Sequence, residues 1–326
     1  MARVATLRQV SMQDWRAVPD DVIQRLCAAE QRRWEKALDW NPGSAWAEID
    51  RGRQLGTVSG LVTFGADGHP TGWTYYLVHD GALQIGAFAA DSQGATAALV
   101  EGIFADPASQ AARRVTFFAF TDAPGIAAAL RARSLTVDRY WYLRRDLVGS
   151  PGGHAFDVCE WRMTHLQATA ALLQRAFERR DLSRPFAPEG TDAEWLQYVA
   201  GLVTGTGCGQ LLPAACCTIG TGPDRLSAVA LVTRIGPLTA HLAQLAVDPA
   251  MRGKHLGTTL VEAACGAAAR AGCTHMTLLV GDHNHAARAL YAGAGFEPVA
   301  AFMSAGGRYP RRSTSVAPGG VIITRR

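Results

Sequence analysis

The sequence predicts an α/β protein made of two similar units in tandem. The chain has 326 residues, 48% hydrophobic and 18% charged, which is enough apolar material for the cores of about two domains. The expected strands and helices follow a similar order on both sides of a glycine- and proline-rich segment at residues 148–154. In the second unit, an apolar strand leads through a glycine-containing loop into a helix.

The first unit spans residues 1–147 and opens with helical sequence that carries Trp15 and Trp34. Apolar or alternating runs predict strands at 61–64, 73–78, 83–90, 114–120 and 138–147. Helices are expected at 92–104 and near 126–133. A strand-rich unit with helices between its last strands is typical of α/β folds.

Residues 148–157 form the predicted linker, and the second unit spans 158–326. This unit opens with Trp161, and we expect strands at 226–234, 240–247 and 276–280, helices near 193–203, 258–271 and 286–292, and further strands after Phe296. The helix at 258–271 has an apolar stripe that faces a sheet, formed by Leu260, Val261, Ala264, Ala267 and Ala268.

Composition excludes several classes of function. No apolar run is long enough for a membrane span, and the N-terminus lacks the apolar region of a secretion signal, so we expect a cytoplasmic protein. The formal charge is +4, and residues 1–150 hold 16 basic and 16 acidic side chains, so the excess lies in the second half. No basic run indicates nucleic acid, and seven cysteines without metal-ligand spacing predict reduced thiols and no metal site.

The loop after the strand at 240–247 is the most informative segment. The strand runs into Asp248-Pro249, a glycine-containing stretch from Arg252 to Gly257 follows, and a helix is expected from Thr258. Unpaired backbone N–H groups at the start of a helix bind phosphate groups. The sequence therefore predicts a protein that binds a nucleotide or coenzyme A.

Three spaced patterns extend this prediction: Val247-Asp248-Pro249, then Arg252-x-x-x-x-Gly257, then Asn284-x-x-Ala287-x-x-x-Tyr291-x-x-x-Gly295-Phe296. Together they resemble the GNAT superfamily of acyl-CoA-dependent N-acyltransferases, most strongly over residues 225–300. The resemblance implies two tandem GNAT-like domains, each with a mixed, mostly antiparallel central sheet flanked by helices. It also implies acetyl-CoA, or another acyl-CoA, as co-substrate and no metal.

The resemblance assigns the cofactor contacts residue by residue. The pyrophosphate would lie on Arg252, Gly253, Lys254, His255, Leu256, Gly257 and Thr258. His255 stands where the family usually has a glycine, and histidine tolerates left-handed backbone better than a β-branched residue does. The backbone of Leu245, Ala246 and Val247 would pair with the pantetheine arm and polarise the thioester carbonyl. Asn284 would either cap the last helix or bond a cofactor amide.

Two residues are candidates for proton transfer. The resemblance implies that Tyr291 protonates the departing thiolate, although a packing tyrosine would look the same in sequence. His241 precedes Leu245 by four residues, so the period of two predicts that both point to one face, and His241 is the candidate base. A strand-edge histidine bonded to backbone is the alternative. His283 and His285 are further candidates, which we expect at the surface.

The acceptor side is expected around the proline-containing stretch 181–188, where Arg184 and Phe186 are the candidate substrate contacts. A purely structural connector is the alternative. The equivalent stretch of the first unit, 83–96, has no phosphate-loop pattern, and residues 121–126 replace the Asn…Tyr helix. We expect that this unit keeps the fold without the acyl-CoA chemistry and serves as scaffold, acceptor wall or dimer surface.

The leading hypothesis is an N-acetyltransferase in which a primary amine attacks the thioester directly. A non-catalytic acyl-CoA-binding or scaffold protein is the alternative, and an acyl-CoA decarboxylase or hydrolase on the same fold is a further one. The expected partner is a small-molecule or peptide amine, and we expect neither nucleic acid nor membrane as a partner. A homodimer is left as an alternative to a monomer.

Overall fold

A computed structural model describes residues 11–39, 43–147, 157–177, 181, 184–205, 208–220, 222 and 224–310. The predicted linker at 148–157 lies outside these ranges except for Asp157. No helix in the described ranges is long and apolar enough to cross a bilayer.

The first half contains the expected alternation of strands and helices, preceded by two helices. Its elements are β1 (Ser11–Asp14), the short 3-10 helix Trp15–Ala17, α1 (Asp20–Leu38), α2 (Gly43–Gln54), β2 (Ser59–Phe64), β3 (Pro70–His79), β4 (Ala82–Ala90), α3 (Gln93–Ala105), the 3-10 helix Pro107–Ala111, β5 (Arg114–Phe120), α4 (Ile126–Ala132) and β6 (Thr136–Asp146). Only two residues separate β4 from α3, as the sequence predicts.

The second half ends with the same order of strands and helices as the first half. Its elements are β7 (Cys159–Glu160), the 3-10 helix Met163–His165, α5 (Leu166–Ala176), α6 (Asp192–Thr204), β8 (Gln210–Leu211), the 3-10 helix Pro213–Ala215, β9 (Cys217–Gly220), β10 (Leu226–Arg234), β11 (Thr239–Val247), the 3-10 helix Pro249–Met251, α7 (Leu256–Arg270), β12 (His275–Gly281), α8 (His285–Gly293) and β13 (Glu297–Arg308). The sequence β11–α7–β12–α8–β13 thus matches β4–α3–β5–α4–β6 of the first half.

All described strands join one sheet, in the order β1-β2-β3-β4-β5-β13-β6-β12-β11-β10-β9-β7, with β8 beside β10. The pairs β4–β5 and β11–β12 are parallel, and the other described pairs are antiparallel. The predicted mixed, mostly antiparallel sheet flanked by helices is confirmed. The halves nevertheless share a single sheet, which differs from the expectation of one sheet for each half.

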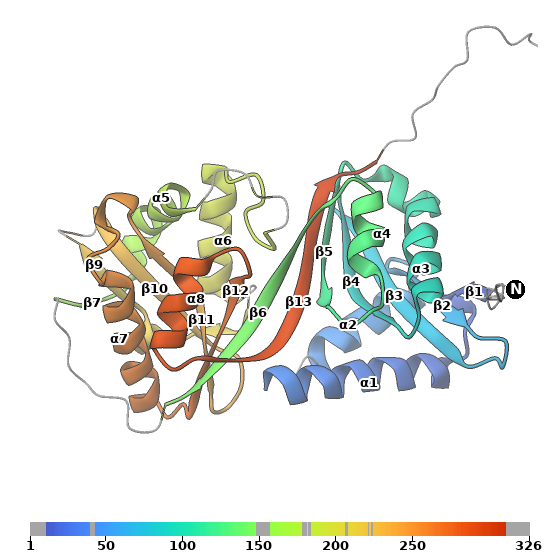
Figure 1. The fold of residues 1–326 in the computed structure, drawn as a ribbon, viewed down its shortest axis with the longest axis horizontal. Coiled ribbons are helices and arrows are strands. Elements are labelled where there is room, and N and C mark those ends of the chain that lie inside the picture. Colours follow the sequence, from blue (N-terminus) through green and yellow to red (C-terminus); the bar gives the residue numbers. More distant parts are fainter. Residues whose placement is uncertain are drawn as a thin grey trace, which may run out of the picture.

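The sheet is continuous because the two closing strands exchange places. β13 of the second half lies between β5 and β6 of the first half, and β6 lies between β13 and β12 of the second (Figure 1). The β6–β13 pair runs from Glu297 opposite Arg144 to Gly306 opposite Thr136. Each half therefore supplies one strand that the other half needs to be complete.

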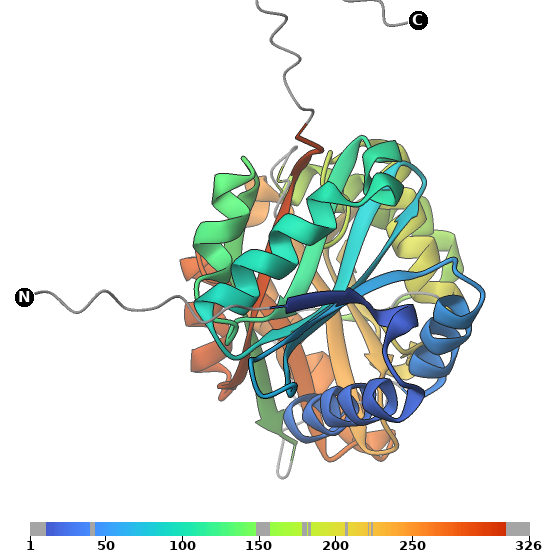
Figure 2. The ribbon, with the colours of Figure 1, turned by 90° about the vertical axis from the view of Figure 1, so that its right-hand side faces the viewer.

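The helices form two layers. α3, α4, α7 and α8 cover one face of the sheet, while α1, α2, α5 and α6 lie on the other (Figures 1 and 2). The α7 stripe predicted from sequence is confirmed, because Leu260, Val261, Ala264 and Ala268 are completely buried and Ala267 is partly buried. On the opposite face, Phe302 and Tyr142 of the exchanged strands pack with Leu38 of α1. The apolar contacts on this face therefore join the two halves.

Candidate functional site

The second half opens at the point where β11 and β12 part. The two strands pair from Thr239 opposite His275 to Leu242 opposite Leu278, and the described ladder stops there. Beyond it, β11 continues to Val247 along β10, while β12 continues to Gly281 along β6. On the edge of β11 that faces β12, the backbone groups of its last residues do not pair with β12. They can form hydrogen bonds with an extended ligand in place of the strand.

A β-bulge in β11 lies at this opening. Leu231 of β10 faces Gln244 and Val232 faces Leu242, so Ala243 is the extra residue. The bulge interrupts the alternation of side chains between the faces. The prediction that His241 and Leu245 share a face is therefore wrong: Leu245 faces α7 with Leu242, whereas His241 shares the opposite face with Gln244.

Residues 248–255 bring the chain from the end of β11 to the start of α7. The helix begins at Leu256, two residues before the predicted start. His255 precedes it in the left-handed conformation, with φ of 60°, as the sequence analysis anticipated. No side chain caps the first turn of α7. Since the first N–H groups of a helix have no intrahelical acceptors, this end of α7 offers donors and a partial positive charge to an anion.

The side chains around this helix start are accessible. Arg252, Lys254, His255 and Thr258 are exposed, and Leu256 and Gly257 are buried beneath them. The Arg252 guanidinium donates to the carbonyl oxygen of Ala176 at the end of α5, over 2.6 Å between Nη2 and O. This contact ties the loop to α5 and leaves the cationic side chain at the surface.

Helix α8 packs close to the start of α7. A Cβ atom at Gly257 would lie 2.9 Å from Cδ1 of Leu290, so glycine permits the close approach of the two helices. Asn284 caps α8, because its Oδ1 accepts from the Ala287 N–H at 3.2 Å. Of the two roles that the sequence left open for Asn284, the structure contains the cap.

Tyr291 lies beside Leu290 on α8 and is buried, with 7% of its surface exposed. Its ring packs edge-on against Phe296, with 5.8 Å between the centroids. Burial raises the pKa of the Tyr291 hydroxyl well above its ordinary value. The hydroxyl therefore keeps its proton and can donate it in a hydrogen bond to a ligand.

His241 lies in the interior on the other face of the sheet. Its Nδ1 is 2.9 Å from Oγ1 of Thr277 on β12, and its ring stacks on Tyr142 of β6, with centroids 5.9 Å apart. Burial lowers the pKa of His241 to about 4. At neutral pH the imidazole is therefore uncharged and able to accept a proton. His283 and His285 are exposed, and His283 pairs with Asp138, as expected for surface residues.

Two polar residues beside the bulge were not foreseen from the sequence. Gln244 is 6% exposed, and its Nε2 has no hydrogen-bond partner among the described residues. The Tyr198 hydroxyl of α6 donates to the carbonyl oxygen of the bulged Ala243 at 3.1 Å. Gln244 could have been noticed as the one amide in the apolar run Leu242–Val247, but the role of Tyr198 depends on the bulge.

The two predicted substrate contacts have different surroundings. Phe186 stacks on Tyr198 with 4.7 Å between the ring centroids, so it lies one side chain away from the bulge. Arg184 is 4% exposed, its Nε donates to the carbonyl oxygen of Phe186 at 3.0 Å, and its guanidinium lies over the Trp195 ring. Arg184 thus orders the loop in which Phe186 is presented.

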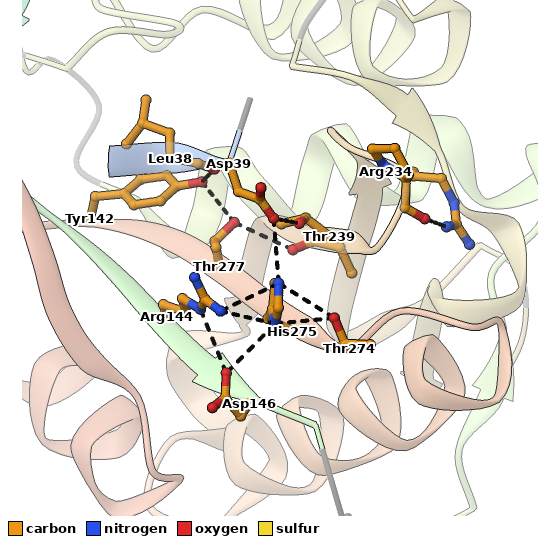
Figure 3. A network of polar contacts seen from close by, with 12 residues as sticks. Leu38, Asp39, Tyr142, Arg144, Asp146, Arg234, Thr239, Thr274, His275 and Thr277 are labelled. Atoms are coloured by element: carbon orange, nitrogen blue, oxygen red, sulfur yellow. Dashed lines mark hydrogen bonds and ion pairs between the residues drawn. The ribbon is translucent and has the colours of Figure 1, made fainter. Parts of the chain in front are cut away.

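The first half covers the His241 face. The carbonyl oxygen of Leu38, at the end of α1, is 3.2 Å from the Tyr142 hydroxyl, which is itself 2.8 Å from Oγ1 of Thr277 (Figure 3). The Asp39 carboxylate contacts the Thr239 hydroxyl and lies 3.3 Å from Nε2 of His275. The end of α1 is therefore a wall beside His241, in keeping with an acceptor-wall role for the first half.

The corresponding position in the first half is closed. Ser92 caps α3, its Oγ accepting from the Ala95 N–H at 3.2 Å, so the start of this helix is not open to an anion as that of α7 is. The strands β4 and β5 part after Ile85 and Phe117, and beyond this point Tyr75 packs against Gly86 of β4. A Cβ atom at Gly86 would lie 2.1 Å from Cζ of Tyr75. The first half keeps the architecture and lacks the open helix start.

Comparison with known proteins agrees with this architecture. Residues 166–296 match the model of the Acetyltransferase (GNAT) family. The matched segment holds α5 to α8, including the parted strands and the open helix start. No curated protein sequence matches the chain.

Solved structures extend the fold similarity to both halves. A GCN5-related N-acetyltransferase from Sphaerobacter thermophilus superposes with a TM-score of 0.61 at 17% identity, covering 93% of this chain and 96% of that one. A tandem GNAT protein from the clavulanic acid biosynthesis pathway gives 0.54 at 15% identity, covering 93% and 99%. The glucosamine N-acetyltransferase region of a fungal multi-domain GH3 beta-N-acetylglucosaminidase gives 0.55 at 14%, covering 92% and 38%. The tandem GNAT architecture predicted from sequence is thus confirmed.

Within the described part of the chain, no group of three or more histidine, cysteine, aspartate or glutamate side chains is arranged to hold a metal ion. The seven cysteines, all of them in that part, are free thiols. The candidate site is thus described by its backbone amides and by the side chains of Tyr291, His241, Gln244 and Tyr198.

Proposed function

We propose that the second half is an acyl-CoA-dependent N-acyltransferase that transfers an acetyl group from acetyl-CoA to a primary amine. The observation that carries the proposal is the uncapped start of α7 next to the parting of β11 and β12. A helix start supplies donors for a pyrophosphate, and an unpaired strand edge supplies partners for the amides of a pantetheine arm.

The residues suit the cofactor in charge and in hydrogen-bonding groups. Arg252 and Lys254 are exposed cations at the α7 start. Gly253, His255 and Thr258 are exposed beside them, and Leu256 and Gly257 are buried beneath. Leu245, Ala246 and Val247 lie on the unpaired side of the opening. Acetyl-CoA supplies the activated acyl group, and a backbone N–H of this segment would polarise its carbonyl.

His241 would accept the proton of the attacking amine, directly or through one water molecule. The Thr277 hydroxyl donates to the carbonyl oxygen of Ala240 at 3.3 Å, so the hydrogen-bond pattern favours the tautomer in which His241 Nδ1–H donates to Thr277. The lone pair is then on Nε2. A pKa of about 4 makes His241 a weak base that is always in its accepting form at neutral pH.

Tyr291 would protonate the departing thiolate. Its hydroxyl keeps its proton at neutral pH because burial raises its pKa. The same shift makes the hydroxyl a weaker acid, so the transfer depends on the thiolate lying in the same buried site, where desolvation raises the thiol pKa as well. The acceptor would lie on the face that carries His241 and Gln244, between Phe186 and the end of α1. The free Nε2 donor of Gln244 suits a carbonyl or hydroxyl oxygen of that acceptor.

A titration with acetyl-CoA by calorimetry tests the binding part. We expect one site per chain, because Ser92 caps the start of α3 in the first half, whereas the start of α7 has no side-chain cap. Arg252→Glu should abolish binding by placing a negative charge at the α7 start, and Arg270→Glu, at the exposed far end of the same helix, is the control. Two sites would contradict the assignment of the first half, and no binding would contradict the proposal.

The low pKa of His241 also favours a second candidate, a non-catalytic acyl-CoA-binding protein, because a base of pKa about 4 contributes little to proton removal. Tyr291→Phe separates the two. An acyltransferase should lose at least about tenfold in kcat with unchanged acetyl-CoA affinity. A wild-type protein that binds acetyl-CoA without turning over any amine in a screen would support the binding protein, and thiol release that does not depend on the amine would indicate a hydrolase or decarboxylase.

A further inference from the structure

The first half holds a cavity of about 430 Å³ on the sheet face that carries His241 in the second half. Its floor comes from β3, β4, β5 and β13, and its cover is the loop Arg184–Pro188 of the second half. The cavity therefore lies between the halves, a common position for small-molecule sites.

The cavity is the internal counterpart of the proposed acceptor site. In the first half Gln84 pairs with Thr116 across β4 and β5, just as His241 pairs with Thr277 across β11 and β12. Gln84 and Thr116 both line the cavity. A glutamine amide does not titrate, so this position has lost the candidate base while the space around it has stayed open.

The charged groups that line the cavity are cationic. Among the described lining residues they are Arg114 and Arg184, and no acidic side chain lines it. Arg184 donates to the carbonyls of its own loop, whereas Nε of Arg114 is buried and has no hydrogen-bond partner in the described part of the chain. Glu194 of α6 lies 3.9 Å from Nη1 of Arg114 and balances its charge only in part. The Arg114 side chain is 42% exposed, so its guanidinium has donor capacity left for a ligand.

Aromatic rings supply the apolar walls. Tyr75, Phe118 and Phe186 line the cavity, and Tyr75 is held in place by stacking on Trp15, with 6.2 Å between the ring centroids. Gln84 is exposed at the cavity and Thr116 is partly exposed, so solutes can reach both. A planar apolar group fits such walls, and an anionic group fits the guanidinium.

We propose that this cavity is a second, non-catalytic ligand site for a small carboxylate that carries an apolar or aromatic group. The carboxylate accepts from Arg114, and the apolar part lies between Tyr75, Phe118 and Phe186. The site is distinct from the acyl-CoA opening of the second half, and it stands whether or not that half transfers acyl groups.

Titration of the full chain with 3-phenylpropionate, followed by ligand-observed NMR, tests this proposal. We expect saturable binding of one molecule per chain, at least about tenfold weaker for the neutral 3-phenylpropanamide, because a charge-assisted bond is lost. Saturating acetyl-CoA should leave the binding unchanged. Equal binding of acid and amide, displacement by acetyl-CoA, or no saturable binding would each overturn the proposal.

Two variants locate the site. Arg114→Gln should weaken binding of the acid about tenfold, whereas Arg113→Gln, an exposed neighbour that does not line the cavity, should not. Thr116→Phe fills the cavity and should abolish binding even if Arg114→Gln fails to fold. Cooperative thermal unfolding identifies the folded variants, and wild-type affinity in a folded Thr116→Phe variant would place the ligand elsewhere and refute the proposal.

Discussion

At the scale of single residues, the candidate site contains polar side chains that are buried, and one of them has a hydrogen-bond donor without an acceptor. His241 is neutral because its surroundings exclude water, and Gln244 keeps an unpaired donor at 6% exposure. An unsatisfied buried donor costs about 1 to 3 kcal/mol. Such a cost is common where a side chain is reserved for a ligand.

The burial of His241 predicts a dependence of stability on pH. Its pKa is about 4 in the folded chain and near 6.5 when unfolded, so the unfolded state binds more protons between these values. The free energy of unfolding should therefore fall as the pH drops through this window, with a contribution from His241 of about 2 kcal/mol between pH 7 and pH 5.

Urea unfolding at pH 7 and pH 5 measures this contribution, with His241→Gln as the control that cannot titrate. The wild type should lose about 2 kcal/mol more than the variant over this interval. Equal losses would mean that His241 titrates normally in the folded chain.

Gln244→Leu should separate stability from function. Replacing an unpaired buried amide by an apolar side chain of similar size should leave the free energy of unfolding unchanged or raise it by about 1 kcal/mol. If Gln244 binds the acceptor, KM for the amine should rise while acetyl-CoA affinity stays the same. A loss of stability with unchanged kinetics would show that the amide has a structural partner instead.

At the scale of elements, sequence predicted what is local. The strand β11, the loop after it and α7 were found within a few residues, because their apolar periodicity and glycines are contiguous in the chain. The bulge at Ala243 was not foreseen, since it depends on the register with β10, and it reversed the expected face of Leu245. Contacts such as Tyr198 with Ala243 join residues 45 positions apart and leave no local pattern.

The left-handed turn before α7 predicts effects of different size for two substitutions. His255 has φ of 60°, which costs a non-glycine residue about 1 kcal/mol or more. His255→Gly should therefore change the free energy of unfolding by less than about 1 kcal/mol, since relief of strain offsets the entropy of glycine. His255→Val should lower it by about 1 to 2 kcal/mol, because a β-branched residue tolerates this conformation worst.

Thermal unfolding of the two variants checks the turn, and acetyl-CoA affinity checks its role. His255→Gly should retain binding, as the backbone donors at the start of α7 stay in place. Similar destabilisation by both variants would mean that the His255 side chain, not the backbone, matters here.

At the scale of the whole molecule, the halves are joined by exchanged strands, by the end of α1 and by the loop Arg184–Pro188. Each half places part of itself over the other half's sheet: Leu38 and Asp39 lie beside the second half's His241 network, and Phe186 lies over the first half's cavity. The sequence predicted two units with one degenerate, but not this exchange, because strand partners are fixed by tertiary packing.

The exchange predicts that neither half folds by itself. Fragments 1–147 and 158–326, expressed separately, should lack cooperative unfolding, because β5 would lose β13, and β12 and β13 would lose β6. Co-expressed, the fragments should associate and recover a cooperative transition by circular dichroism. A first fragment that unfolds cooperatively alone would show that β13 is dispensable for it.

The place of β13 also bears on how the chain folds as it leaves the ribosome. Domains made of contiguous sequence can fold one after the other during synthesis, the first while the second is still being made. Here the strand that completes the first half is made after nearly all of the second half, since β13 begins at Glu297. Until then the edge of β5 stays open, so the nascent first half must wait for its last strand, and slow translation would prolong the period in which it can aggregate.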